Sequence, residues 1–70
     1  MTPNNTFLKE IGRKVKAARK ANKMTLPTLA QLAKTDMSNL WFLEKGERNT
    51  HILTLKSIAD VFNMDVKDFI

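Results

Sequence analysis

The fold is decided by residues 25–46, TLPTLAQLAKTDMSNLWFLEKG, which predict two short helices joined by a tight connection. The apolar residues of the first helix recur at i, i+3, i+4 and i+7, and they are Leu26, Leu29, Ala30 and Ala33. Thr25 precedes this helix as an N-cap, and Pro27 lies in its first turn, where the missing N–H costs nothing. Because helices this short are not stable alone in water, the rest of the chain must bury their apolar stripes.

The second helix of this stretch follows after a two-residue break. Asp36 is a candidate N-cap, and the helix is expected over residues 37–44. Leu40 and Leu43 are its inward positions. Gly46 then supplies a C-terminal stop, because glycine adopts the left-handed conformation without cost.

The N-terminal part predicts a longer helix after a disordered tail. Residues 1–5 are polar and contain a proline, so we expect them to be disordered. Asn5 or Thr6 can cap a helix that runs to about Ala21. Its apolar stripe consists of Leu8, Ile11, Val15 and Ala18.

Residues 50–70 predict a fourth helix and a final short turn. Thr50 or His51 caps the fourth helix, and Asn63 ends it because asparagine tolerates the left-handed conformation. The inward positions of this helix are Ile52, Leu55, Ile58, Ala59 and Phe62. Asp65 can cap the last turn, whose apolar side consists of Val66, Phe69 and Ile70. Since no stretch alternates as a strand does, the sequence predicts an all-α fold, with five helices around one core.

Composition excludes several classes of protein. A chain of 70 residues is one small domain, and it contains no cysteine and a single histidine, His51, which has no partner at metal-ligand spacing. We therefore expect no disulfide, no metal and no other cofactor. No apolar run approaches the roughly 20 residues that a membrane span needs, and the N-terminus lacks the pattern of a signal peptide. These features favour a cytoplasmic protein that does not contact a membrane.

The charge is unevenly distributed along the chain. The net charge is +5, and residues 1–34 hold eight basic residues and one acidic residue, whereas residues 35–70 hold four basic and six acidic residues. Within the first helix and just beyond it, the basic positions at one face are Lys9, Arg13, Lys16, Lys20 and Lys23. This stripe is either a solvated outer face or a source of one or two contacts to a polyanion, most often nucleic acid.

Four segments resemble the Cro/CI-type (XRE) helix-turn-helix family. They are IGRKVKAARKANKMT, LPTLAQLAK, LWFLEKGERN and LKSIADVFNMDVKDF, and with their spacing the resemblance covers residues 11–70. The family consists of DNA-binding transcriptional regulators, including restriction-modification controllers. The resemblance implies a lambda-repressor-like helix-turn-helix DNA-binding domain over residues 6–70. It also implies a compact five-helix bundle whose second helix crosses the DNA backbone and whose third helix enters the major groove.

Three positions depart from the family pattern. Leu26 stands where the family usually has a glutamine that contacts phosphate. Lys34 replaces the usual glycine between the two central helices, and Lys23 replaces a glycine before the second helix. These lysines predict either left-handed residues that carry a side chain or turns of slightly different geometry.

The resemblance assigns the third helix to base recognition. The candidate base-contacting residues are Met37, Ser38, Asn39, Trp41 and Phe42. Ser38 and Asn39 can hydrogen-bond base edges or phosphate, whereas Met37 and Phe42 could touch thymine methyl groups. Trp41 and Phe42 leave three alternatives open: packing against Leu26 or a neighbouring helix, contact with DNA, or contact with a protein partner or second subunit.

Contacts to the DNA backbone and one ion pair complete the predicted site. The candidate backbone-contacting residues are Thr25, Thr28, Lys45, Arg48 and Asn49. The alternative for the last three is that they serve solubility and capping. Arg19 lies at the border of the first apolar stripe, where a charge needs a partner, and related proteins commonly pair this position with that of Glu44.

The sequence therefore predicts a sequence-specific regulator of transcription that binds double-stranded DNA. We expect a repressor or autoregulator that covers a near-palindromic operator as a homodimer, with Phe62 and Val66 in the core and Phe69 and Ile70 in the dimer interface. The alternative is a protein-interaction module, for example an antitoxin that binds its partner with the apolar face of the third helix. No nucleophile–base pair, glycine-rich phosphate loop or pair of catalytic acids is apparent, so we do not expect an enzyme.

Overall fold

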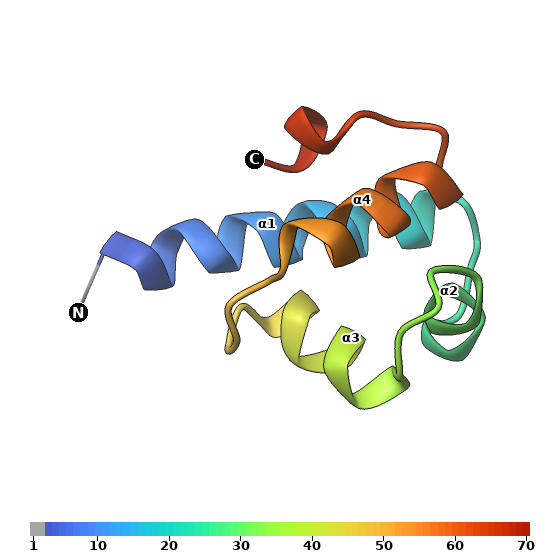
Figure 1. The fold of residues 1–70 in the computed structure, drawn as a ribbon, viewed down its shortest axis with the longest axis horizontal. Helices are drawn as coiled ribbons and strands as arrows, with labels where there is room; N and C mark the ends of the chain where they lie inside the picture. The colour runs from blue at the N-terminus through green and yellow to red at the C-terminus, as the bar shows by residue number, and fades with distance from the viewer. Residues whose placement is uncertain (1–2) are drawn as a thin grey trace.

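Helices account for all the regular structure of residues 3–70, the part of the chain that the computed structural model describes, with side chains from residue 6 onward. In chain order the elements are α1 (Pro3–Ala21), α2 (Leu26–Leu32), α3 (Met37–Lys45), α4 (Ile52–Val61) and η1 (Val66–Phe69) (Figure 1). The all-α class is confirmed. The expected fifth helix is wrong in kind, because η1 is a 3₁₀ turn of four residues and only the other four elements are α-helices.

The first helix begins earlier than expected. Residues 1–2 of the predicted disordered tail lie outside the described residues, but residues 3–5 form the first turn of α1. Pro3 is tolerated there because the first helical position has no intrahelical partner for its N–H, and the fixed φ of proline suits a helix.

The elements pack around α1 and α2. Helix α3 contacts both of them, α4 contacts α2, and η1 folds back onto α1 and α4 (Figure 1). The buried core receives side chains from every element, and it consists of Ile11, Val15, Leu29, Ala30, Ala33, Leu40, Leu43, Leu55, Ile58, Ala59 and Phe69. The apolar stripes predicted for the first three helices thus form one core, with Leu8, Ala18 and Leu26 partly buried at its margin.

The central pair of helices is capped as the sequence predicts. Thr25 Oγ1 accepts a hydrogen bond from the backbone N–H of Thr28 at 3.3 Å, and Asp36 Oδ1 accepts one from that of Asn39 at 2.6 Å. Each cap supplies a partner for an N–H that the helix itself leaves unpaired. At the other end of α3, Gly46 is left-handed, with φ of 71°.

Both lysines at the family's glycine positions adopt the left-handed conformation. The φ angles of Lys23 and Lys34 are 55° and 59°, so the turns keep their geometry and the side chains are accommodated in it. Asn63 ends α4 in the same conformation, with φ of 56°, as predicted. A side chain at such a position costs roughly 1–2 kcal/mol, which the contacts on either side of each turn must offset.

The C-terminal turn departs from the prediction in which side chain it buries. Asp65 caps η1 in a reciprocal arrangement with Asp68, and Phe62 and Val66 pack against the core as expected. Phe69, however, is only 1% exposed within the monomer, so the prediction that it lies in a dimer interface is wrong. Ile70 is the residue that remains on the surface.

The start of α4 also differs from its prediction. Ile52 is 59% exposed rather than inward, although Leu55, Ile58 and Ala59 on the same helix are buried. Ile52 lines an open hollow beside Leu8 and Ile11 of α1, so a residue with the correct helical spacing lies at the margin of the core and stays accessible to solvent. The exposed side chain is therefore available to a surface contact.

Two glycines let α1 approach α3 closely. A Cβ atom on Gly12 would overlap the carbonyl oxygen of Leu43 and lie 2.5 Å from that of Glu44. A Cβ atom on Gly46 would lie 2.6 Å from Cα of Lys9. Because these neighbours are backbone atoms, any larger residue forces the two helices apart.

An ion pair joins the same two helices about two turns further along α1. Arg19 Nε donates to Glu44 Oε2 at 2.8 Å, and Arg19 Nη2 donates to Glu44 Oε1 at 3.1 Å. The side chains are only 13% and 7% exposed. Arg19 Nη1 also donates to the carbonyl oxygen of Met24 at 2.9 Å, so the guanidinium ties α1, the α1–α2 connection and α3 together. The predicted pair is present.

A second ion pair on α1 is exposed and local. Arg13 Nε donates to Glu10 Oε1 at 2.8 Å, and this hydrogen bond together with the guanidinium charge lowers the pKa of Glu10. Both side chains are more than half exposed, so water screens the attraction. This pair provides a matched control for the shielded one.

Replacing Glu44 by alanine should strongly destabilise the fold. Arg19 would be left as a shielded charge without its bidentate partner, which costs about 3 kcal/mol when a buried pair is broken from one side. Thermal unfolding followed by circular dichroism measures the loss, with Glu10→Ala as the control that should melt as wild type does. A Glu44→Ala midpoint within error of wild type would contradict the structural role of the pair.

Gly12→Ala should also destabilise the fold, against the trend expected for a helix. Alanine favours a helix over glycine by about 1 kcal/mol, so a Gly12 free of contacts would give a more stable variant. Overlap with the α3 carbonyl groups should reverse the sign, at a net cost of about 1–3 kcal/mol. Urea unfolding of the variant gives the sign directly, and an increase in the midpoint concentration would show that the close approach is not needed.

Candidate nucleic-acid interface

Helix α3 presents its first turn to solvent. Met37 is half exposed and Ser38 is exposed, while Leu40 and Leu43 on the opposite side enter the core. Asp36 is occupied by the cap described above. The exposed start of α3 is thus apolar at Met37 and polar at Ser38, and both residues lie where the resemblance places base contacts.

Trp41 and Phe42 form an edge-to-face pair on α3. Their ring centroids are 5.0 Å apart and the planes make an angle of 85°. From helical spacing we expect Phe42 to point outward and Trp41 to lie on the flank, but the order is reversed: Trp41 is 45% exposed and Phe42 is half-buried. Trp41 is therefore the aromatic residue that a partner can reach, and the less exposed Phe42 packs against its ring.

Each aromatic ring is covered by a cation. Lys45 Nζ lies 4.5 Å from the centroid of the Trp41 ring, and Arg48 Cζ lies 4.1 Å from the centroid of the Phe42 ring. Such contacts are worth about 0.5–1 kcal/mol at exposed sites and restrict where a long side chain can lie. Two of the predicted phosphate-contacting residues are therefore held directly beside two of the predicted base-contacting residues.

An apolar hollow of about 260 Å³ opens between the start of α2 and the exposed side of α3. Its lining consists of Leu26, Met37, Ser38, Trp41 and Phe42. Leu26 contributes a wall in place of the amide that the family usually has there, and it is partly buried against the core.

A second hollow of about 170 Å³ adjoins the first and shares Leu26 and Trp41 with it. It brings Lys16 of α1 to the same surface as Lys45, above the Arg19–Glu44 pair. We name the surface formed by the first hollow and its three flanking cations, Lys16, Lys45 and Arg48, the α3 face. The sequence placed Lys16 in a stripe that is either solvated or a source of one or two contacts to a polyanion, and helical spacing alone does not show which of its members lies beside α3.

The threonines at the start of α2 lie exposed and bonded to each other. Thr25 Oγ1 donates to Thr28 Oγ1 at 2.8 Å while it caps the helix. Asn39 is less free than its neighbours, because its side-chain amide donates to Thr35 Oγ1 at 2.9 Å and the residue is half-buried. The roles of these residues toward DNA stay predictions.

Asn49 is placed apart from the α3 face. It lines a hollow of about 360 Å³ between the first half of α1 and the start of α4, together with residues that include Phe7, Ile52 and Ile70. Leu53 is the most exposed apolar residue of the described side chains, at 77%. We name Phe7, Ile52 and Ile70 of this hollow, together with the neighbouring Leu53, the uncharged face; Lys14 Nζ lies at its edge, 3.4 Å from the carbonyl oxygen of Ile70. Helical spacing could have shown that Leu53 is exposed, because it lies two residues before the buried Leu55 and therefore on nearly the opposite side of α4.

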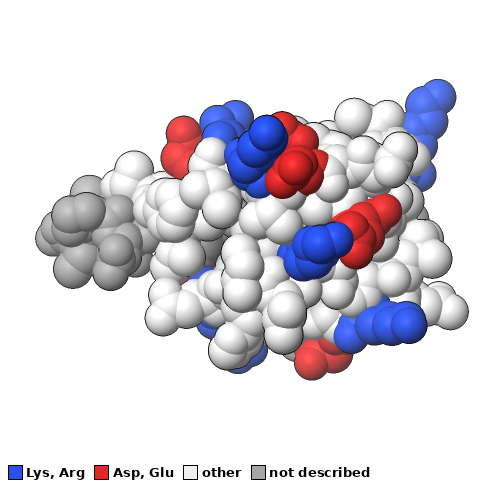
Figure 2. Space-filling model, turned by 45° about the horizontal axis from the view of Figure 1, so that its top comes forward, with Lys and Arg blue, Asp and Glu red and all other residues white. Residues whose placement is uncertain are grey.

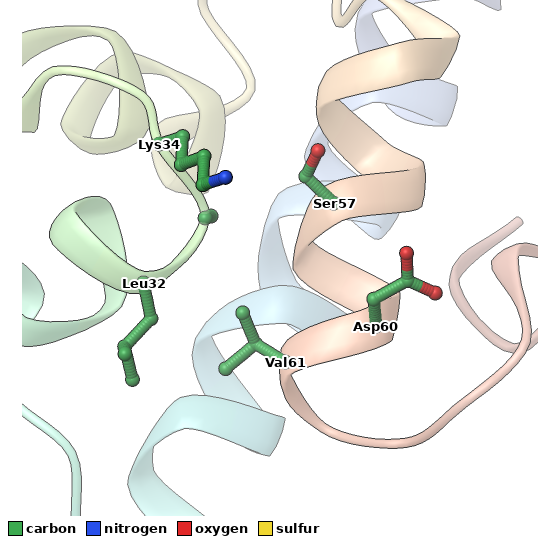
Figure 3. Close-up of a pocket in the computed structure, with 6 residues that line it drawn as sticks. Leu32, Lys34, Ser57, Asp60 and Val61 are labelled. Atoms are coloured by element: carbon green, nitrogen blue, oxygen red, sulfur yellow. The ribbon is translucent and has the colours of Figure 1, made fainter.

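A further hollow of about 400 Å³ lies between α2 and α4 (Figure 3). Leu32 and Lys34 line it from the side of α2, and Ser57, Asp60 and Val61 line it from α4. The Lys34 amine points across it, whereas Asp60 is already paired with Lys56 at 2.7 Å. Its mixed polar lining lacks the ring of cations found around the α3 face.

The described residues show neither a metal-binding cluster nor a membrane-spanning helix. Within residues 3–70, no group of three or more His, Asp or Glu side chains is placed to hold a metal ion. Over the same residues, none of the helices combines the length and the apolar character that crossing a lipid bilayer requires.

Comparison with known proteins gives matches among solved structures. No family model matches the sequence, and no curated protein does. The chain superposes on the restriction-modification controller protein C.AhdI from Aeromonas hydrophila with a TM-score of 0.86 and 24% identity, covering 90% of this chain and 96% of that one.

Two further solved structures are regulators. The HTH_3 family transcriptional regulator from Vibrio cholerae has a TM-score of 0.87 and 29% identity, over 94% of this chain and 37% of that one. The clp gene regulator ClgR from Corynebacterium glutamicum has a TM-score of 0.85 and 22% identity, over 90% of this chain and 67% of that one.

The matches agree with the geometry of the central helices. A short capped helix, a tight turn and a second capped helix with one face open to solvent are the parts of a helix-turn-helix motif. The chain therefore has the XRE-type helix-turn-helix fold of transcriptional regulators.

Proposed function

We propose that this chain is a sequence-specific regulator of transcription that binds double-stranded DNA through the α3 face. The observation that carries the proposal is the placement of Lys16, Lys45 and Arg48 around the open side of α3 in a helix-turn-helix fold. When such a helix lies in the major groove, cations at its edges can bind the phosphates on either side of that groove. Regulation needs no bond to be made or broken, since a bound protein blocks or positions polymerase by occupancy.

The overall charge of the chain also favours DNA as its partner. The chain carries a net charge of +5, which favours association with a polyanion and gives an affinity that falls as salt rises. Thr25 and Thr28 lie exposed at the start of α2, the helix that crosses the DNA backbone in this motif. Hydroxyl groups and backbone N–H groups at this end can bind phosphate, which fixes the register of α3 without reading sequence.

We propose further that two copies bind a near-palindromic operator as a repressor or autoregulator. One small module buries only about 600–1,000 Å² of protein surface on DNA, so a second copy adds the contacts that specific affinity requires. A two-fold axis relates two half-sites about 34 Å apart, and it requires the same surface on both subunits.

The uncharged face is the better candidate for that subunit contact now that Phe69 is assigned to the core. Residues 49–55, which include the start of α4, contain no Lys, Arg, Asp or Glu. Figure 2 shows an area without charged side chains at the end of the molecule where α1 begins. Two positively charged subunits approach with least repulsion through such a surface, and we include the exposed Ile70 in the proposed contact.

A protein-interaction module is the second candidate, and the exposed Trp41 favours it. Large exposed aromatic residues are typical of sites that bind proteins. The surrounding cations weigh against it, because desolvating three positive charges against an apolar partner is costly. A search of random double-stranded DNA for enriched sequences separates the two, since a consensus supports the regulator and its absence at low salt contradicts it.

Arg48→Ala should weaken binding to all DNA sequences about equally and reduce the slope of log K against log salt by about one unit. The reason is that a lost phosphate contact releases one counterion fewer. Titrations by fluorescence anisotropy at four salt concentrations measure the slope. Lys56→Ala is the control, because Lys56 lies on α4 and pairs with Asp60. Equal effects from both variants would contradict the assignment of the DNA-binding surface.

Leu53→Glu should convert a dimer into a folded monomer. The two-fold axis brings each new carboxylate close to its symmetry mate, and like charges in an apolar contact are strongly unfavourable. Sedimentation equilibrium at high micromolar concentration measures the mass of wild type and variant. The matched control is Leu32→Glu, an exposed leucine on α2 away from this face. A monomeric wild type, or dissociation by both variants alike, would contradict the proposed interface.

A further inference from the structure

The exposed side of α3 offers few groups that can hydrogen-bond a base edge. The side chains that usually identify bases are arginine or lysine on guanine and asparagine or glutamine on adenine. The amide of Asn39 is engaged with Thr35, and Lys45 lies over the ring of Trp41. Ser38 is therefore the one exposed polar side chain in the first turn of α3, and the other exposed residues of this helix are Met37, Trp41 and Lys45.

The apolar hollow of the α3 face is preformed. Leu26 rests against the core, and Phe42 is half-buried between Trp41 and the guanidinium of Arg48. These contacts fix the positions of Leu26, Trp41 and Phe42 before any ligand binds. Met37, half exposed and unbranched, stands at the opening and can adapt to what enters.

The rim of the hollow favours nucleic acid as its occupant. Lys45 lies at its edge over Trp41, Arg48 lies over Phe42, and Lys16 lines the adjoining hollow. In the major groove of DNA the phosphates lie on both sides of the base edges, so an apolar centre between cations matches an apolar group between phosphates. The apolar group that the major groove displays is the C5-methyl of thymine.

We propose that this chain reads its DNA chiefly through pyrimidine 5-methyl groups that enter the hollow formed by Leu26, Met37, Trp41 and Phe42. The inference rests on the DNA-binding function proposed above and specifies what that same face recognises. Each methyl group that leaves water should improve the dissociation constant about fourfold. The hollow senses the methyl group and not the O4 atom of thymine, so 5-methylcytosine carries the group it would accept, whereas uracil and cytosine do not.

Replacing thymine by deoxyuridine tests this by removing only the methyl group. The probe is a double-stranded oligonucleotide that contains the sequence enriched from random DNA, with each thymine replaced singly. We expect about a fourfold loss of affinity at one or two positions in each half-site and none at the others. Trp41 is the single tryptophan of the chain, so its fluorescence also reports whether the hollow is filled.

Two variants test whether the methyl group binds in the hollow. Met37→Ala and Trp41→Ala alter exposed side chains outside the core, and each should bind thymine- and uracil-containing DNA with nearly the same affinity. Lys20→Ala, an exposed cation on α1, is the matched control and should keep the full uracil penalty. Circular dichroism of each variant establishes that it is folded.

The possible outcomes distinguish failure of methyl recognition from failure of DNA binding. Specific binding with equal affinity for thymine and uracil at every position would overturn methyl reading and leave the DNA-binding function intact. A uracil penalty that persists in both Met37→Ala and Trp41→Ala would overturn the assignment to this hollow. Failure of the wild type to bind any double-stranded DNA at low salt would overturn the function and the inference together.

Discussion

The bidentate pair between Arg19 and Glu44 is the constraint on which the rest of the structure depends. It joins α1 to α3 on the same face of α1 on which Gly12 meets the α3 backbone, and Gly46 allows a further close approach at Lys9. Two charges so well shielded from water are retained only with complete hydrogen bonding, and the third donor of Arg19 goes to the carbonyl oxygen of Met24. Helix α3 is too short to hold its own position, so this contact sets the direction in which its open face points.

With α3 fixed in this way, the molecule acquires two surfaces of different chemistry. The α3 face combines an apolar hollow with cations, and one of those cations, Lys16, belongs to α1 and reaches the face only because the two helices are packed closely. The uncharged face lies at the start of α4, where Ile52 and Leu53 stay exposed. A small domain buries a limited share of its apolar side chains, so both surfaces keep apolar groups in contact with water.

Much of the fold follows from local signals in the sequence. The N-caps at Thr25 and Asp36 and the stop at Gly46 act within one turn of the chain, and each is present where the sequence predicts it. Helical spacing likewise identifies the buried residues of α1, α2 and α3, because a stripe of one width can face only one core. The left-handed turns at Lys23 and Lys34 could be anticipated only from the resemblance, since lysine has no preference for that conformation.

By itself, then, the sequence determined the four α-helices, the caps and stop of α2 and α3 and most of the core, because caps, stops and stripes are interactions between residues a few positions apart. Tertiary structure alone decided which of Phe69 and Ile70 is buried, that Ile52 is exposed, and that Trp41 rather than Phe42 faces outward. Each of these depends on whether another element happens to cover the side chain, and spacing along one helix carries no information about its neighbours. The hollow between α2 and α3 belongs to the same class, because its walls come from Leu26 and Trp41, which meet only after the helices pack.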